Sequence, residues 1–324
     1  MTPVLRALRE NASRWNLPSA YDPDRESSVC RDLGVEVLTP EGGCFPDLLR
    51  SIPDPPLALY LRGGPLAGDA LGIVGSRRPT PYGRRMAREL AAGCARAGIV
   101  VVSGLARGID GEAHRAALEA GGRTWAVIGS GLDRMYPPGH EELAGSIVSS
   151  GGAVLSEVPL GGEPLASNFP RRNRILSGLC WGTVVVEGDI KSGSLVTARL
   201  ALEQGREVFA VPGPADSPLS FGPHELLRQG ARLARGIEDI LEDLPMLGPR
   251  APGRPAWSVA PEPGPGGNTL EQKKILELLG RHALGLEELA AATGWEVPRL
   301  LRALSELEAG GLIAPLPGQR YGRI

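Results

Sequence analysis

The sequence has 324 residues, with 35 basic and 37 acidic side chains and a formal net charge of −2. At roughly 100–200 residues per domain, it is long enough for two or three domains. The charge balance excludes binding to nucleic acid through a uniformly basic surface, although it is compatible with a local basic face.

The N-terminus lacks the apolar core of a signal peptide, and no apolar run approaches the roughly 18 residues of a membrane-spanning helix. We therefore expect a cytoplasmic protein without membrane contact. The cysteines are far apart and form no Cys-x-x-Cys pair, so neither a disulfide framework nor a metal site is predicted; they are Cys30, Cys44, Cys94 and Cys180.

Residues 1–65 contain two helical patches, Val4–Arg14 and Ser27–Leu33, followed by the proline cluster Pro53-Asp54-Pro55-Pro56. Seven Lys/Arg and nine Asp/Glu give this segment a net charge of −2, which does not suit a DNA-binding arm. The pattern predicts a small helical domain with a proline-rich lead into the next one.

Residues 66–245 alternate apolar runs with helical stretches. The runs are apolar throughout, which is typical of parallel strands covered by helices on both faces. This pattern predicts an α/β fold with a doubly wound, Rossmann-like, mostly parallel sheet. The predicted strands are Leu71–Val74, Ile99–Ser103, Thr124–Ile128, Ala153–Ser156, Thr183–Val186 and Glu207–Val211, and the predicted helices are Tyr82–Ala97, Ile109–Ala120, Gly139–Ser150, Arg171–Leu179 and Ser194–Gln204.

The segment 246–268 is rich in proline and glycine, a composition that is typical of a flexible linker. Residues 269–324 then predict a winged helix-turn-helix, with helices at Leu270–Leu279, Leu286–Thr293 and Val297–Ala309 and two strands within 310–323 that pair as a wing. Seven basic and seven acidic residues cancel between 265 and 324. Both DNA binding and a protein-contact or regulatory role therefore stay open for this module.

Five of the predicted strands end in turns that contain glycine or serine. Ligands of doubly wound sheets bind outside the carboxyl ends of the strands, so we expect these turns to line one common crevice. They are Gly75-Ser76, Ser103-Gly104, Gly129-Ser130-Gly131, Glu187-Gly188 and Pro212-Gly213.

The first of these turns, Gly75-Ser76-Arg77-Arg78, leads from a strand into a helix. Glycine and serine let backbone N–H groups approach an oxyanion, and the helix N-terminus adds a positive potential equivalent to roughly half a charge. The turn therefore predicts a phosphate site. The alternative is an ordinary glycine-containing turn with two solvated arginines.

Basic residues recur at the same predicted edge of the sheet. Residues 71–110 carry seven arginines against one glutamate and one aspartate, and two further basic stretches begin helices, Asn168-Phe169-Pro170-Arg171-Arg172-Asn173-Arg174 and Lys191-Ser192. Three basic stretches along one edge suit several consecutive phosphates better than a single one.

Phe169 adds an aromatic ring to this edge, and single-stranded nucleic-acid binders combine a basic groove with aromatic side chains that stack bases. The alternative is that Phe169 belongs to the core and that the arginines pair with acidic residues, namely Glu157, Glu163 and Glu187. Arg107 and Asp110 are a candidate ion pair that would fix the crevice.

No catalytic constellation is apparent in the sequence. The P-loop pattern is missing, the first turn has Gly72-x-x-Gly75 in place of the dinucleotide fingerprint, and the histidines form no His-x-x-x-His pair. We therefore predict no catalytic residue, no cofactor and no metal.

Taken together, the motifs resemble the DprA/Smf family of DNA-processing proteins. The stretches that carry the resemblance are Gly75-Ser76-Arg77, Ser103–Asp110, Gly129-Ser130-Gly131 with Tyr136-Pro137, Ser156-Glu157, Asn168–Ile175, Ser192–Ala198 and Val211-Pro212-Gly213, with Phe45-Pro46 and Asp54-Pro55-Pro56 upstream.

The resemblance implies a Rossmann-like domain that binds single-stranded DNA without sequence preference, forms a homodimer, and loads the RecA recombinase onto incoming strands during natural transformation. It implies no turnover. Residues 1–65 would then be a SAM-like helical domain, shorter than the one many members carry, and residues 269–324 the winged helix that some members have.

Position by position, the resemblance assigns phosphate binding to Arg77 and to Lys191. The DNA-binding residues expected from the turns and the resemblance are Gly75, Ser76, Arg77, Arg78, Asn168, Phe169, Arg171, Arg172, Arg174, Lys191 and Ser192.

Two other functions remain as alternatives. The core and first turn are similar to those of the LOG-type nucleoside-monophosphate phosphoribohydrolases, which need a Pro-Gly-Gly-x-Gly-Thr-x-x-Glu run where this chain has Glu187-Gly188 and Lys191–Ser194. A transcriptional regulator that reads duplex DNA with its winged helix is the other alternative.

Overall fold

The computed structural model describes residues 2–15, 21–247, 270–279, 284–295, 297–309, 312–316 and 320–323. The chain divides into two compact units, Met1–Gly253 and Arg254–Ile324. Most of the predicted linker, from residue 248 onward, lies outside the described residues.

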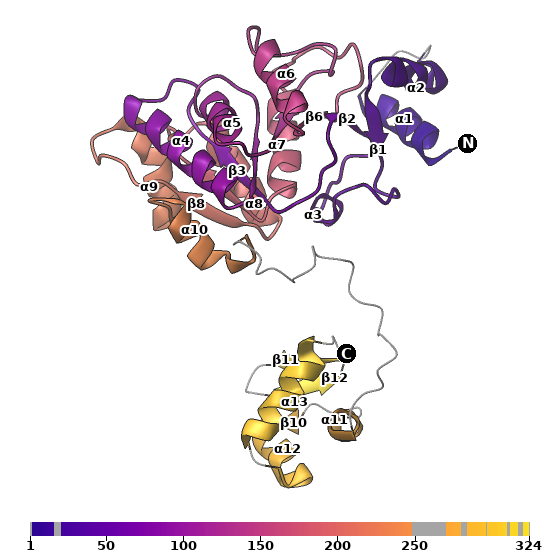
Figure 1. Ribbon diagram of the computed structural model, residues 1–324, viewed down its shortest axis with the longest axis vertical. Coiled ribbons are helices and arrows are strands. Elements are labelled where there is room, and N and C mark those ends of the chain that lie inside the picture. Colours follow the sequence, from indigo (N-terminus) through magenta and orange to yellow (C-terminus); the bar gives the residue numbers. More distant parts are fainter. Residues whose placement is uncertain are drawn as a thin grey trace. The chain divides into compact units, whose positions relative to one another are not determined.

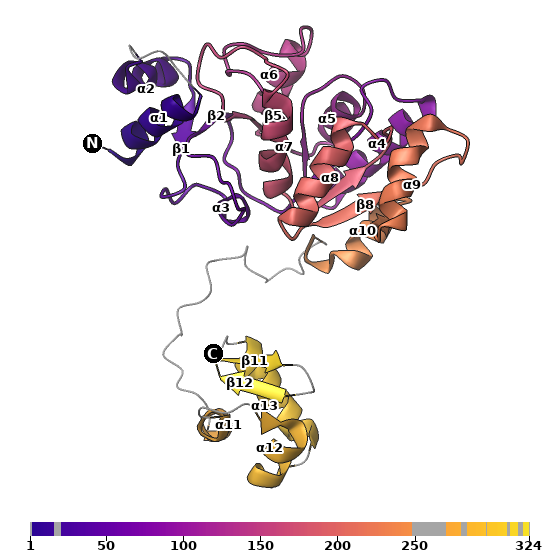
Figure 2. The same ribbon diagram turned by 180° about the vertical axis from the view of Figure 1, so that it is seen from behind.

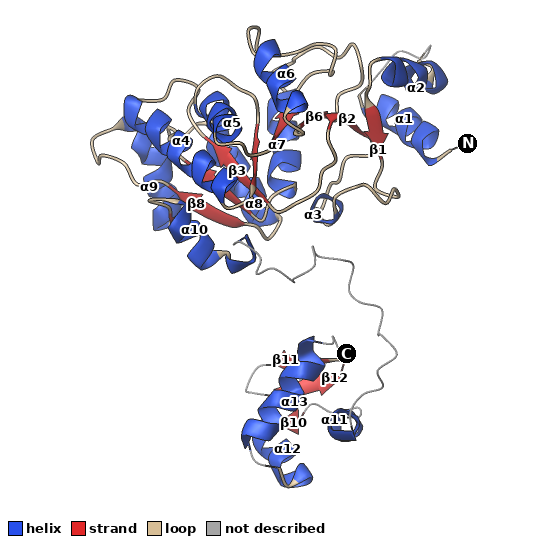
Figure 3. Cartoon of the chain, viewed as in Figure 1, coloured by secondary structure: helices blue, strands red, loops and turns tan. Residues whose placement is uncertain are grey.

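Nine strands form one sheet within the described residues of the first unit, in the order β1-β2-β6-β5-β4-β3-β7-β8-β9 (Figures 1 and 3). All neighbours from β6 to β9 pair in parallel, whereas β2 is antiparallel to β6 and β1 is antiparallel to β2. The strands are β1 Glu36–Leu38, β2 Leu59–Gly63, β3 Ala70–Val74, β4 Val100–Ser103, β5 Thr124–Ile128, β6 Ala153–Ser156, β7 Gly182–Val185, β8 Glu207–Ala210 and β9 Arg232–Leu233.

Helices cover both faces of this sheet, as Figures 1 and 2 show from opposite sides. The helices described in this unit are α1 Pro3–Arg14, α2 Pro23–Asp32, α3 Asp47–Arg50, α4 Pro81–Arg96, α5 Ile109–Glu119, α6 Glu141–Ser149, α7 Asn168–Gly178, α8 Gly193–Glu203, α9 Phe221–Arg228 and α10 Ile237–Asp243, with 3-10 turns at Pro218–Ser220 and Pro245–Leu247.

The two faces follow from the alternation of side chains along each strand. On β3, Leu71 and Ile73 pack in one core cluster with residues of α4, α5 and α10. Ala70 and Val74 belong to the opposite cluster, with residues of α3, α7, α8 and α9. Both faces are apolar, which explains the unbroken apolar runs in the sequence.

The predicted doubly wound α/β sheet is confirmed, and the six predicted strands correspond to β3–β8 with ends that differ by at most one residue. Helix α7 begins at Asn168 rather than at the predicted Arg171. Pro170 then falls in the first turn, where a proline is tolerated because its missing N–H would have no intrahelical partner.

Residues 1–65 differ from the prediction. They contain β1 and β2 besides the helices α1, α2 and α3, and β2 joins the main sheet through Tyr60–Ser156 and Leu61–Leu155 pairing. The first 65 residues and the Rossmann-like sheet therefore belong to one compact unit. The sequence did not reveal these strands because β1 has three residues and the apolar run of β2 follows directly on the proline cluster.

The second unit has the predicted winged-helix arrangement. Its helices are α11 Leu270–Leu279, α12 Leu286–Thr293 and α13 Val297–Ala309, and the wing strands β11 Ile313–Leu316 and β12 Arg320–Arg323 pair antiparallel, with β10 Leu284–Gly285 on the other side of β12. Ile275, Leu289, Leu304 and Ile313 form its core with their neighbours. Among the helices described in either unit, none has the length and apolar content needed to cross a bilayer.

Candidate functional site

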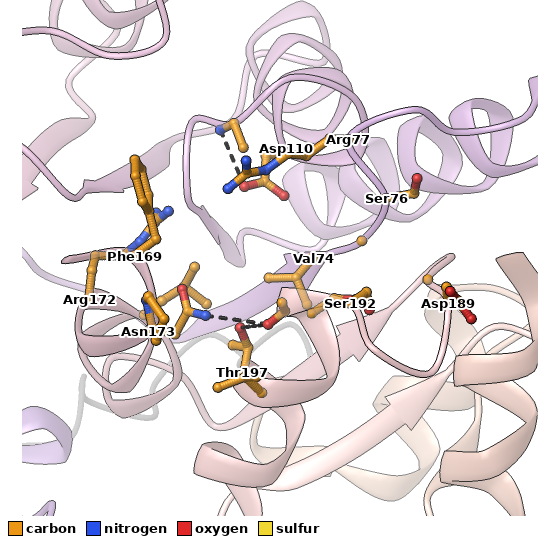
Figure 4. Close-up of a pocket in the computed structure, with 18 of the residues that line it drawn as sticks. Val74, Ser76, Arg77, Asp110, Phe169, Arg172, Asn173, Asp189, Ser192 and Thr197 are labelled. Atoms are coloured by element: carbon orange, nitrogen blue, oxygen red, sulfur yellow. Dashed lines mark hydrogen bonds between the residues drawn. The ribbon is translucent and has the colours of Figure 1, made fainter. Parts of the chain in front are cut away.

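A cleft of about 610 Å³ opens at the carboxyl ends of β3, β4 and β7. The strand order reverses between β3 and β7, which is where doubly wound sheets bind their ligands. Figure 4 shows Phe169, Arg172 and Asn173 of α7 on one side of this cleft and Ser192 and Asp189 on the other. The prediction that five turns line one common crevice holds in part. Gly75-Ser76 and Gly188 line this cleft, whereas the turns Ser103-Gly104, Gly129-Ser130-Gly131 and Pro212-Gly213 are not among its lining residues.

The turn after β3 is held in place by close packing. A Cβ on Gly75 would lie 2.7 Å from Cγ1 of Ile109 and 2.9 Å from the carbonyl oxygen of Glu187, so only glycine fits. Gly108 has φ +80°, and the next residue, Ile109, donates its N–H to the carbonyl oxygen of Ser76 at 3.1 Å. The backbone of the turn is thereby fixed beside the cleft.

Arg77 and Arg78 extend from this fixed turn into solvent. Both side chains are exposed, and neither has an ion-pair partner within the described residues. Arg77 lines the cleft together with Gly75 and Ser76. The Arg77 guanidinium lies 5.6 Å from the ring centroid of Phe169, within the range of a cation–π contact.

Phe169 is half-buried and faces the cleft. Its ring lies 5.5 Å from that of Tyr136 at an interplanar angle of 53°, and a Cβ on Gly129 would lie 3.2 Å from its Cδ1. The ring therefore packs against the protein on part of its surface and faces the open cleft with the rest.

Arg172 forms part of the cleft wall and is only 7% exposed. It donates to the carbonyl oxygen of Val127, and its charge faces Asp110, which accepts the N–H groups of Gly104 at 3.1 Å and Ala106 at 3.3 Å. Burial lowers the pKa of Arg172 to about 10, so the side chain is cationic at neutral pH. The Arg172 Nε has no hydrogen-bond partner within the described residues.

The candidate pair Arg107–Asp110 does not form. Asp110 is buried, and burial raises its pKa, with Arg172 as the opposing positive charge. Arg107 is exposed and makes no ion pair in the part of the chain that the structure describes. The positive charge that opposes the effect of burial on Asp110 therefore comes from Arg172, which is distant in the sequence, rather than from the nearby Arg107.

Arg171 and Arg174 lie away from the cleft. Arg174 contacts Glu157, with Nη2 to Oε1 at 2.6 Å, and Asp54, with Nε to Oδ2 at 2.8 Å. Arg171 lies 4.3 Å above the ring of Trp15 and 3.6 Å from Glu157. The alternative in which Glu157, Glu163 and Glu187 pair with the arginines thus holds for Arg171 and Arg174 through Glu157. Arg172 instead faces Asp110.

Asp54 and Glu157 receive further contacts from α1. Arg14 lies 2.5 Å from Asp54 and 3.7 Å from Glu157. Burial alone would raise the pKa of Asp54, but Arg14 and Arg174 outweigh it and hold this pKa below its usual value. The N-terminal helix is thereby joined by charge to α7, the helix that carries Phe169 and Arg172.

The other predicted residues have mixed surroundings. Asn168 is buried and donates to the carbonyl oxygens of Gly129 at 3.0 Å and Glu163 at 3.1 Å. Ser192 lines the cleft, and its Oγ lies 2.6 Å from Oγ of Ser194. Lys191 is exposed, next to Ser192, but is not among the residues that line the cleft.

Several residues of the cleft were not predicted as binding residues, Tyr136 and Asn173 among them. Both lie in motifs that were recognised, Tyr136-Pro137 and the basic run that starts at Asn168. Asn173 is buried, and its Nδ2 donates to the carbonyl oxygen of Gly193 at 3.4 Å, which connects α7 to the start of α8.

Glu187 has a structural partner. Its buried carboxylate accepts the Thr80 N–H at 2.9 Å, and a Cβ on Gly83 would collide with it. It thus lies at the N-terminus of α4, where a negative charge is favourable. Within the described residues, no group of His, Cys, Asp and Glu could hold a metal ion.

Two family models match the chain. DNA recombination-mediator protein A matches residues 36–245, which begin at β1, and the DprA winged helix domain matches residues 259–319. The chain is 44% identical to Protein Smf of Escherichia coli (strain K12) over 301 residues, covering 90% of this chain and 79% of that protein. It is 45% identical to the DNA processing protein DprA of Bacillus subtilis (strain 168) over 224 residues, covering 68% and 75%.

Solved structures give the same relationship. The X-ray structure of DNA processing protein A from Streptococcus pneumoniae has a TM-score of 0.62 at 34% identity and covers 75% of this chain and 93% of that one. A structure of DNA processing protein A from Helicobacter pylori, described for its single-stranded DNA binding mode, has a TM-score of 0.59 at 31% identity. The match covers 66% of this chain and 97% of that one.

Proposed function

The chain belongs to the DNA recombination-mediator protein A family, and on this premise we propose that its cleft binds single-stranded DNA without sequence preference. We further propose that it forms a homodimer through the Rossmann-like unit, protects incoming strands and loads the RecA recombinase during natural transformation. Because Cys30, Cys94 and Cys180 are buried free thiols, a cytoplasmic location suits the protein.

One observation supports the binding proposal above the others. The Arg77 guanidinium and the Phe169 ring lie side by side at one cleft, on a fixed turn and at the start of a long helix. A cation for the phosphate and a ring face for the base are the two components of non-specific single-strand binding, since every base has a π face.

We also propose that the protein acts without turnover and without a cofactor. The alternative of a nucleoside-monophosphate phosphoribohydrolase would need a glutamate at the ligand. Glu187, the candidate for that role, binds Thr80 at the N-terminus of α4 and does not line the cleft. Release of base from a nucleoside monophosphate by the wild type, and its loss in Glu187→Ala, would overturn this part of the proposal.

The binding proposal is tested by the salt dependence of affinity for a fluorescent oligothymidine. Each phosphate neutralised contributes roughly −0.7 to the slope of log affinity against log salt. Arg77→Ala should lower the affinity about tenfold, as expected for one charge-assisted contact, and make the slope less steep by about one phosphate.

Arg96→Ala is the matched control, because Arg96 is an exposed arginine at the other end of α4, away from the cleft. Arg96→Ala should leave both the affinity and the salt slope close to those of the wild type. If Arg77→Ala and Arg96→Ala behave alike, Arg77 does not contact the strand and the proposal fails.

A further inference from the structure

A second hollow of about 400 Å³ adjoins the cleft. The two share Arg77, Ala106, Tyr136 and Phe169 as lining residues, so the Arg77–Phe169 pair stands between them. The remaining wall of the second hollow comes from Arg78 and from the turns after β4 and β5, including Arg107.

The second hollow carries positive charge that the described residues do not neutralise. Arg77, Arg78 and Arg107 are exposed, and no ion pair in the described part of the chain involves any of them. Neighbouring Arg88, by contrast, contacts Glu112 and Glu119. Three uncompensated guanidinium groups around one hollow are suited to a polyanion.

The second hollow also has an aromatic wall. The Tyr136 side chain is 37% exposed and is tilted against Phe169, and Pro137 and Pro138 continue this wall. An exposed ring beside unpaired arginines is the same combination of groups that Phe169 and Arg77 make in the cleft.

We propose that the second hollow binds the next nucleotides of the strand that occupies the cleft, with Tyr136 against a base and Arg78 and Arg107 on phosphates. This inference rests on the proposed single-strand binding. A single strand is the favoured occupant because the two hollows share a wall. A ligand that continues from one hollow into the other gains the second set of contacts without the entropy cost of a second association.

The test measures affinity for oligothymidines of increasing length, from the dinucleotide upward, by fluorescence anisotropy. Arg107 lines only the second hollow, so Arg107→Ala should match the wild type on the shortest oligonucleotide that binds. For oligonucleotides long enough to span both hollows, the affinity of Arg107→Ala should be about tenfold lower than that of the wild type. Its salt slope should be less steep than the wild-type slope by roughly 0.7.

Tyr136, which lines both hollows, supplies a second variant that tests the aromatic wall. Tyr136→Ala should weaken binding of the longer oligonucleotides several-fold, whereas Tyr136→Phe should retain it, because stacking uses the ring and not the hydroxyl. Arg134→Ala is the control: Arg134 is an exposed arginine two residues away that lines neither hollow and lies 4.0 Å from Glu163. Thermal unfolding checks that each variant is folded.

The outcomes separate this inference from the proposed function. If the wild type binds no oligothymidine of any length, the proposed function fails and this inference fails with it. The wild type could bind while Arg107→Ala loses affinity equally at all oligonucleotide lengths, or loses affinity at no length. In either case the second hollow does not bind additional nucleotides, and only this inference is overturned.

Discussion

Phe169 touches Arg77, Tyr136 and Gly129, yet still faces the cleft. If its ring stacks a base, Phe169→Ala should weaken single-strand binding by roughly 1–3 kcal/mol. Binding of heparin, which has negative charges but no bases, should barely change. Equal losses for DNA and heparin in a folded variant would show instead that Phe169 supports the shape of the cleft.

His114 is a second residue whose surroundings lead to a prediction, because burial affects the protonation of its imidazole. It is fully buried on α5, with Nδ1 2.6 Å from Oγ1 of Thr124, and that hydroxyl donates to the Val101 carbonyl oxygen at 2.6 Å. The imidazole Nδ1 must therefore be the donor, and Nε2 has no partner within the described residues. Burial is the main cause that lowers the pKa of His114 to about 3, and the positive charges of Arg172 and Arg115 act in the same direction.

Because the His114 imidazole has a lowered pKa in the folded protein, we expect the folded state to become less stable in acid. In the unfolded chain, histidine titrates near pH 6.5, so below about pH 6.5 the unfolded state binds a proton that the folded state does not. The free energy of unfolding should fall as pH falls, by up to about 1.4 kcal/mol per pH unit from this site. His114→Leu should show a flatter dependence by urea unfolding, and an unchanged slope would contradict the buried neutral imidazole.

At the scale of the elements, the charges between α1 and α7 determine how the cleft wall is held. Glu157 is 3% exposed and contacts Arg14, Arg171 and Arg174, while Asn11 of α1 donates to its carbonyl oxygen at 3.1 Å. Removing one partner of a buried ion pair is costly, because the other charge stays buried without compensation.

Glu157→Gln should therefore lower the free energy of unfolding by roughly 3 kcal/mol. The control is Glu89→Gln, which removes an exposed carboxylate 3.7 Å from Arg85 and should cost less than about 1 kcal/mol. Urea unfolding of both variants gives the comparison. A difference too small to measure would mean that the network contributes little to the attachment of α7.

The same network shows what the sequence could and could not reveal. Arg171 and Arg174 are three residues apart and so share a face of α7. Arg172 is rotated about the helix axis by about 100° from Arg171 and so points to another side. The helical period therefore predicts that the basic run divides between two sides. The partners could not be predicted, because Trp15, Asp54 and Glu157 come from distant parts of the chain.

Strands β3–β8 were predictable because parallel strands covered on both faces leave unbroken apolar runs. The edge strands were not, since β1 has a mixed burial pattern and both residues of β9 are exposed. The position of the cleft followed from the glycine turns. The second hollow did not, because it depends on how Tyr136, Arg78 and Arg107 meet in space.

At the scale of the whole molecule, the division into two units predicts separable binding. The cleft lies within the first unit, so a chain that ends at Gly253 should bind single-stranded DNA within about twofold of the full-length affinity, equivalent to less than about 0.5 kcal/mol. Gel shifts with single-stranded and duplex DNA, for both lengths of chain, provide the measurement. A strong loss of single-strand binding in the shorter chain would place a necessary contact in the winged helix.

The pairing of β2 with β6 also bears on how the chain folds as it is made. Tyr60 pairs with Ser156 and Gly63 with Ala153, so β2 emerges from the ribosome about 90 residues before its partner. At 5–20 residues per second this is a delay of roughly 5–20 s. During that time Leu59 and Leu61 can pair with β1 but lack β6, their neighbouring strand on the other side. The nascent N-terminal segment should therefore be a target for chaperones and proteases until β6 has been synthesised.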